Sequence, residues 1–304
     1  IEIGVAARKL KRKKETNAEW GNILKATCQD KLSASLDRLQ QSGIPITQAS
    51  MPYNAQTIGK GLGVNVIGTE RDVDNSQPRI FCFDDIVDGT WNAASGCGFS
   101  ASTMLALSYE TTHPIEKMKI NDFWLGIIIP HQAEGFYYGV DHTPPYFCSW
   151  NKKEAVVHLT KETDPTKTRC FIDLFTTQTY EQLLTAIRGV VPIIAEWADF
   201  ARFYGAGVEV TSLFGRKNIA PGFGAYVAAN QKVDNLISTK IMIESAGGIV
   251  SDWGGLAIGN RGLEDRVNVI MAANLPLYES LLRLIHMGLD SIPPFDFPFN
   301  KAKD

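Results

Sequence analysis

The sequence of 304 residues lacks several features that would assign it to a specialised class of protein. It has no run of 18 or more apolar residues, so no membrane-spanning helix is expected. Basic residues are not in excess, because 30 lysines and arginines oppose 33 aspartates and glutamates, and this balance argues against a dedicated nucleic-acid-binding protein. It shows no internal repeat. The hydrophobic content of 44% is that of an ordinary globular protein with one large domain or two closely packed domains.

Cysteine and histidine are also sparse. The five cysteines form no CxxC pair, and the five histidines form no HxxxH motif or mixed cluster with cysteine. A zinc site and a disulfide framework are therefore not expected, and reduced thiols in a cytoplasmic protein are the simplest interpretation. The basic run at 8–14 is interpreted as a solvated helix face rather than a nucleic-acid-binding patch.

Apolar spacing and turn residues predict a mixture of helices and strands. Helical spacing of isoleucines and leucines predicts a helix over 17–41, closed by Gly43 and Pro45. Further helices are expected near 180–188, 234–246 and 277–287, and strands near 64–68, 79–83, 124–129, 135–140, 168–174, 248–251 and 267–272. This order implies an α/β or α+β layered protein. A polar cluster at 163–168 places a soft boundary between subdomains 1–165 and 166–304.

An apolar strand that runs into carboxylates is the most informative feature, and it reads FCFDDIVDGT. Asp85 and Asp88 are three residues apart across an expected turn, so their carboxylates could enter one pocket together with the carbonyl of Val87. Such oxygens are the ligands that Mg²⁺ prefers. Gly89 and Thr90 would begin a helix whose N–H groups face phosphate oxygens. By itself, the pattern fits an aspartate-rich helix cap equally well.

Three separated segments resemble the inositol monophosphatase family. The sequence DIVDGT at Asp85–Thr90 is similar to the family signature Asp-Pro-Ile-Asp-Gly-Thr, with isoleucine in place of proline. The sequence IGTE at Ile67–Glu70 resembles the family's Gly-Glu-Glu and keeps one glutamate. Asp234, followed by an expected helix and by ESAGG from Glu244, resembles the family's Trp-Asp, helix and Glu-Ala-Gly-Gly. The resemblance extends over about 64–285.

The resemblance implies an alternating α-β-α-β-α sandwich of the inositol monophosphatase and fructose-1,6-bisphosphatase type. It also implies a magnesium-dependent, lithium-sensitive phosphomonoesterase, commonly a homodimer, in which two or three Mg²⁺ ions bind and Mn²⁺ can substitute. The implied metal ligands are Glu70, Asp85, the carbonyl of Val87, Asp88 and Asp234. Gly89 and Thr90 would contact the phosphate. Glu70 and Thr90 would position the attacking water and help to deprotonate it, with Asp88 beside them as a catalytic carboxylate.

The substrate end of the family pattern is altered. RFYGAG at 202–207 resembles the Arg-x-x-Gly-Ser-Ala stretch of the substrate pocket, which would contribute Arg202, Gly205, Ala206 and Gly207. Arg202 would serve there as a phosphate contact or as a packing residue. Seven residues before Asp234, inositol-specific members have a glutamate and this chain has Val227, which should weaken strict inositol selection. The expected substrate is a small phosphorylated polyol, sugar or nucleotide.

Two other interpretations stay open at this stage. A fructose-1,6-bisphosphatase or a 3′(2′),5′-bisphosphate nucleotidase would need further basic residues for a second phosphate, and Arg216, Lys217 and Lys240 are candidates. A non-catalytic binding protein on the same scaffold is the alternative of another class. Cys28 favours it, because it stands where the family has the aspartate that supports the catalytic threonine. Retention of every predicted metal carboxylate disfavours it.

Overall fold

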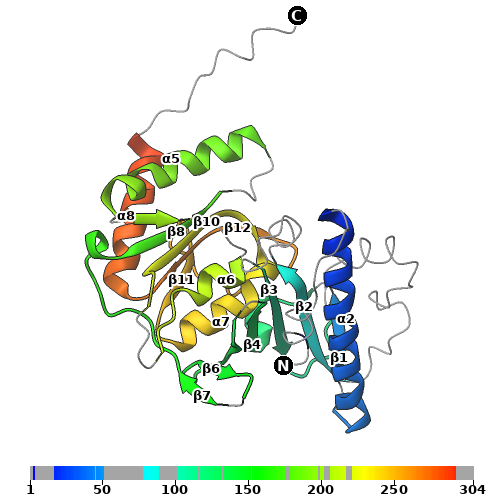
Figure 1. Cartoon of the computed structure of the whole chain (residues 1–304). Coiled ribbons are helices and arrows are strands. Elements are labelled where there is room, and N and C mark those ends of the chain that lie inside the picture. The colour runs from blue at the N-terminus through cyan, green and yellow to red at the C-terminus, as the bar shows by residue number, and fades with distance from the viewer. Residues whose placement is uncertain are drawn as a thin grey trace, which may run out of the picture.

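The computed structural model describes residues 3, 17–44, 46–50, 78–88, 101–114, 117–131, 133–151, 153–174, 179–197, 199–201, 206–216 and 221–291. Within these ranges the chain forms two β-sheets with helices outside and between them (Figure 1). This confirms the predicted α/β layered class. None of the described helices has the length and apolar character that a bilayer crossing requires.

The first sheet has seven strands in the sequential order β1 to β7. Its strands are β1 (Ile46–Ser50), β2 (Ile80–Asp88), β3 (Ser102–Ser108), β4 (Phe123–Pro130), β5 (Gly135–Val140), β6 (Tyr146–Ser149) and β7 (Glu154–Val156). Strands β1 and β2 pair in parallel, and each later neighbour pairs antiparallel. Helix α2 (Asn17–Gln41) packs on β1 and β2, where it buries Cys28, Leu32 and Leu36.

The second sheet has five strands in the order β11-β12-β10-β8-β9. Its strands are β8 (Arg169–Asp173), β9 (Asp199–Ala201), β10 (Ala225–Lys232), β11 (Ile249–Asp252) and β12 (Arg266–Ala272). The central strand β10 pairs in parallel with β8 and antiparallel with β12. Its apolar residues from Ala225 to Ala229 are fully buried, because both faces of this sheet are covered by helices.

Three short helical segments lie between the sheets, and two long helices cover the outer face of the second sheet (Figure 1). The inner segments are α6 (Ala206–Thr211), the 3₁₀ helix η5 (Val233–Leu236) and α7 (Ile237–Ser245), and the outer helices are α5 (Tyr180–Glu196) and α8 (Leu275–Ser291). Every side chain from Ile237 to Ile243 is buried, as expected of a helix enclosed on all sides. Its polar members are paired; Ser238, for example, donates to the carbonyl of Leu105 over 2.7 Å.

Most expected elements are found, with shifted ends. The helix over 17–41 is confirmed as α2, and the strand pair at 124–129 and 135–140 is confirmed as antiparallel β4 and β5. Helix α5 continues past its predicted end at Arg188, through Pro192. Strand β10 was not predicted, nor were β1, β3, β6, β7, β9 and α6. The strand predicted at 64–68 lies outside the described residues. The subdomain boundary near residue 165 stays a prediction.

Candidate metal and phosphate site

Strand β2 carries the acidic segment. The expectation that the strand ends where the carboxylates begin is wrong, because β2 continues to Asp88. The pairing with β3 slips between Asp85, opposite Met104, and Asp88, opposite Ser102, so that β2 holds one extra residue. Such a β-bulge re-aims side chains along a strand. It therefore replaces the expected turn as the device that places these two carboxylates.

Asp88 is buried and held by two hydrogen bonds. The backbone N–H of Gly207 donates to its Oδ2 over 2.8 Å, and the hydroxyl of Ser102 donates to the same oxygen over 3.4 Å. Burial, together with the charge of Asp85, raises the pKa of Asp88 to about 7, and the hydrogen bond from the Gly207 N–H opposes this shift. Both hydrogen bonds use Oδ2, so Oδ1 remains for another ligand.

Asp234 enters the site from η5, directly after strand β10. Its side chain is buried, and its Oδ1 has no hydrogen-bond partner among the described residues. Burial raises the pKa of Asp234 to about 7; the charge of Lys232 opposes this shift and the charge of Asp85 adds to it. A buried carboxylate oxygen without a donor is costly, and a bound cation is one partner that would satisfy it.

Asp85 connects the two buried carboxylates, because its charge raises the pKa of Asp88 and of Asp234 alike. Asp85 and Asp88 lie on the same strand, β2, whereas Asp234 lies on η5, a distant part of the sequence. Among the described residues, no three histidine, cysteine, aspartate or glutamate side chains form a ready metal cage. A Mg²⁺ site needs only one or two carboxylates beside water and phosphate oxygens, so these carboxylates fit that ion.

Several predicted site residues cannot be placed. Glu70, Gly89, Thr90, Arg202 and Gly205 lie outside the described residues. The backbone of Val87 belongs to β2. These positions keep the roles that the family resemblance implies for them, as predictions.

The predicted substrate stretch reaches the carboxylates at its end. Ala206 begins α6, and the N–H of Gly207 is used to hold Asp88. A Cβ atom at position 207 would collide with Oγ of Ser102 and approach Sδ of Met104 to 3.0 Å. Glycine is therefore required at this position for α6 to approach strand β3 closely.

Two residues near the site were not predicted from the sequence. Asp173 is buried at the end of β8, where its Oδ2 accepts a hydrogen bond of 2.8 Å from Nε2 of Gln231. Its charge also contributes to the raised pKa of Asp88. A carboxylate at the end of a predicted buried strand was the available signal for Asp173. No comparable signal marked Gln231, because strand β10 itself was not predicted.

Cys28 belongs to helix α2, on the face that packs against the first sheet. Its thiol is buried, which raises its pKa to about 12, and it is hydrogen-bonded to Thr103 on β3. The Oγ1 of Thr103 also lies 3.0 Å from Nε2 of the buried His131. Cys28 therefore belongs to a buried polar chain between α2 and the first sheet.

Comparisons with known proteins give matches among solved structures. No protein-family model and no curated protein matches the chain. SuhB of Mycobacterium tuberculosis is 15% identical with a TM-score of 0.61, over 95% of this chain and 94% of that one. An inositol monophosphatase of Zymomonas mobilis is 16% identical with a TM-score of 0.60, over 94% and 93%.

A calcium-bound inositol monophosphatase (IMPase) family protein of Staphylococcus aureus is 10% identical with a TM-score of 0.57, over 86% of this chain and 83% of that one. At these identities the likeness concerns the fold, and it agrees with the resemblance of the sequence motifs. The chain has the layered α/β fold of the inositol monophosphatases.

Proposed function

We propose that this protein is a divalent-cation-dependent phosphomonoesterase that hydrolyses a phosphate ester of a small polyol or sugar. One observation carries the proposal. The charge of Asp85 acts on both Asp88 and Asp234, and burial leaves these two carboxyl groups with raised pKa values. Carboxyl groups whose pKa values are raised in this way cluster at functional sites.

Asp85, Asp88 and Asp234 would hold Mg²⁺, with Glu70 and the carbonyl of Val87 as further ligands. When bound, the ions supply positive charge for the phosphate and lower the pKa of the attacking water. Two or three Mg²⁺ ions are proposed, as in the family that the motifs resemble, and Mn²⁺ can replace them. The orphaned Oδ1 of Asp234 is the structural feature that most directly supports a cation here.

The chain itself supplies positioning. Gly207 and Ser102 fix Oδ2 of Asp88, so this carboxylate is held in place before any ligand binds. Such preorganisation lowers the cost of reaching the transition state, because little has to reorient during the reaction. Glu70 and Thr90 are proposed to orient the attacking water and to accept its proton.

Strand β10 bears on the choice of substrate through Val227. The side chain of Val227 is apolar and fully buried, so it offers no hydrogen-bond acceptor to an inositol ring. A substrate other than a strictly selected inositol phosphate is therefore proposed. Lithium sensitivity, a homodimer and a cytoplasmic location belong to the same proposal.

Two of the basic residues expected to bind a second phosphate, Lys240 and Arg216, make other contacts. Nζ of Lys240 is buried between Glu244, at 2.7 Å, and Oδ1 of Asn121, at 3.1 Å. The guanidinium of Arg216 lies 3.8 Å from the centre of the Phe147 ring. Neither contact directs the cation toward Asp88. Lys217 lies outside the described residues.

The test is phosphate release by the purified protein with Mg²⁺, on a panel that includes inositol 1-phosphate, fructose 1,6-bisphosphate and adenosine 3′,5′-bisphosphate. Asp85→Asn should lower the turnover of an accepted substrate by about 100-fold or more. Loss of a residue that only supports a metal ligand lowers activity by about 10- to 100-fold, and loss of a ligand itself should cost at least as much. Asp37→Asn, on the exposed face of α2, is the matched control and should keep full activity.

Silence of the wild type on the whole panel would favour the non-catalytic interpretation. Normal turnover by Asp85→Asn would remove the site assignment.

A further inference from the structure

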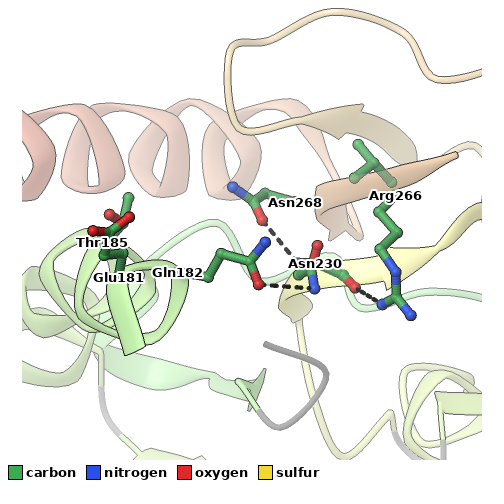
Figure 2. Close-up of a pocket in the computed structure, with 7 residues that line it drawn as sticks. Glu181, Gln182, Thr185, Asn230, Arg266 and Asn268 are labelled. Carbon is green, nitrogen blue, oxygen red and sulfur yellow. Dashed lines mark hydrogen bonds between the residues drawn. The ribbon is translucent and has the colours of Figure 1, made fainter. Parts of the chain in front are cut away.

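A polar cavity lies at the first turn of α5, beside the ends of β10 and β12 (Figure 2). Its volume is about 430 Å³, within the range of small-molecule sites. Its lining residues are Glu181, Gln182, Thr185, Asn230, Arg266, Val267 and Asn268. Six of these seven residues are polar, so the cavity suits a hydrophilic ligand rather than an apolar one.

The floor of the cavity is a bulge in strand β10. Between Ala228 and Gln231 this strand has one residue more than β12 opposite it, and Asn230 adopts a left-handed conformation with φ of 54°. The N–H of Asn230 donates to Oδ1 of Asn268 over 2.8 Å, and its Nδ2 donates to Oε1 of Gln182 over 3.4 Å. These bonds tie both strands to helix α5 (Figure 2).

The same hydrogen bonds leave donors at the cavity. The Oδ1 of Asn268 is occupied, so its Nδ2 is the group that remains for a ligand. Arg266 donates one N–H, from Nη1 to the carbonyl of Asn230 over 2.8 Å, and forms no ion pair within the described part of the chain. A guanidinium has five N–H donors and a permanent charge. In Figure 2, Glu181 lies beside Thr185, away from Arg266.

We propose that this cavity, the Arg266 pocket, binds a phosphate group. Guanidinium and amide N–H groups around one space match phosphate oxygens, which only accept hydrogen bonds when ionised. The proposal stands on the pocket alone and does not depend on the proposed function.

The chain connects the pocket to the carboxylates. Asn230 is followed at once by Gln231, whose Nε2 binds Asp173, and the charge of Asp173 acts on Asp88. Asn230 thus faces the pocket on the α5 side, and Gln231 faces Asp173 on the other side of β10.

The proposal is tested in EDTA with inorganic phosphate, by calorimetry and by amide chemical shifts. Without divalent ions the carboxylates repel phosphate, so binding at the Arg266 pocket is seen alone. Wild type should bind saturably, and Arg266→Gln should weaken binding about tenfold or more, the scale of one charged hydrogen bond. Arg283→Gln removes a surface arginine paired with Glu196 and is the matched control, with unchanged binding expected.

A second variant guards against misfolding of Arg266→Gln. Thr185 is exposed on α5 and lines the pocket, so Thr185→Glu adds a carboxylate there without disturbing packing. It should also weaken phosphate binding about tenfold, because a like charge is placed beside the ligand. No saturable binding by wild type, or equal binding by wild type and Thr185→Glu, overturns the phosphate site.

Phosphate binding in EDTA together with no turnover on any ester would overturn the proposed function alone.

Discussion

Burial of the carboxyl groups of Asp88 and Asp234 lowers the stability of the folded state unless a cation binds them. Oδ1 of Asp234 has no donor in the described part of the structure, although the residue lies in the interior. Functional sites commonly hold such unfavourable groups, and substitutions that remove them often stabilise a protein while abolishing activity. The site can therefore be tested through stability as well as turnover.

Asp234→Asn should raise the melting temperature in EDTA by roughly 2 °C or more, since an amide is cheaper to bury than a carboxylate. The same variant should lose the rise in melting temperature that Mg²⁺ gives to wild type, because binding to the native state alone stabilises it. Differential scanning calorimetry with and without Mg²⁺ measures both. A variant that melts lower in EDTA and still responds to Mg²⁺ would refute this account of Asp234.

The contribution of the sequence at this scale was uneven. Asp85, Asp88 and Asp234 were predicted because each stands in a motif whose spacing survives. Asp173 and Gln231 were missed because their pairing depends on β8 and β10 lying side by side, which no local pattern states.

At the scale of elements, the approach of α6 to β3 decides how Asp88 is held. The N-terminal turn of α6 comes close enough for Gly207 to donate to Asp88, and only a residue without Cβ permits this. The hydrogen bond from Gly207 to Asp88 and the packing of α6 on β3 therefore both require that residue 207 has no Cβ atom.

Gly207→Ala should destabilise the protein by about 1–3 kcal/mol, the usual cost of overpacking. It should also lower turnover, because α6 must move away from Asp88 to make room. The double variant Ser102→Ala with Gly207→Ala should recover part of the stability, since Oγ of Ser102 is the nearest obstacle. Urea unfolding measures the free energies; additive losses in the double variant would contradict this explanation.

Elements were predictable where their apolar pattern is regular. Helix α2 and the strands β4 and β5 follow their sequence periods closely. Strand β10 did not, because it is buried on both faces and ends in the polar sequence NQK, which reads as a loop. Helix α5 was ended too early in the prediction, although Pro192 is accommodated within it.

At the scale of the whole molecule, stability depends on a buried polar chain between α2 and the first sheet. His131 is 3% exposed, and its Nδ1 has no partner among the described residues. Burial lowers the pKa of His131 to about 4. The folded state therefore keeps this ring neutral where the unfolded chain would protonate it.

For a base with a lowered pKa in the folded state, stability is complete above the unfolded value of about 6.5 and falls as the pH drops toward 4. Wild type should lose about 3 kcal/mol of unfolding free energy over this interval relative to His131→Gln. Urea unfolding at several pH values gives the difference. Parallel pH profiles for the two proteins would show that His131 does not titrate in this way.

The layered arrangement as a whole was predictable only through the family resemblance, since composition and periodicity led no further than a mixed α/β protein. Which helix lies between the sheets depends on long-range packing. Helix α7 is enclosed between the two sheets (Figure 1), although its sequence ISTKIMIES contains serine, threonine, lysine and glutamate.

The extra residue in strand β10 determines which side of the strand each of the following side chains faces. With it, Asn230 turns toward α5 and Gln231 turns toward Asp173. Deleting one residue there would exchange inward and outward positions up to Asp234, so the amide of Gln231 and the carboxylate of Asp234 would both be misdirected. Deletion of one residue here would therefore disable the Arg266 pocket and the candidate metal site together, while point substitutions could affect them separately.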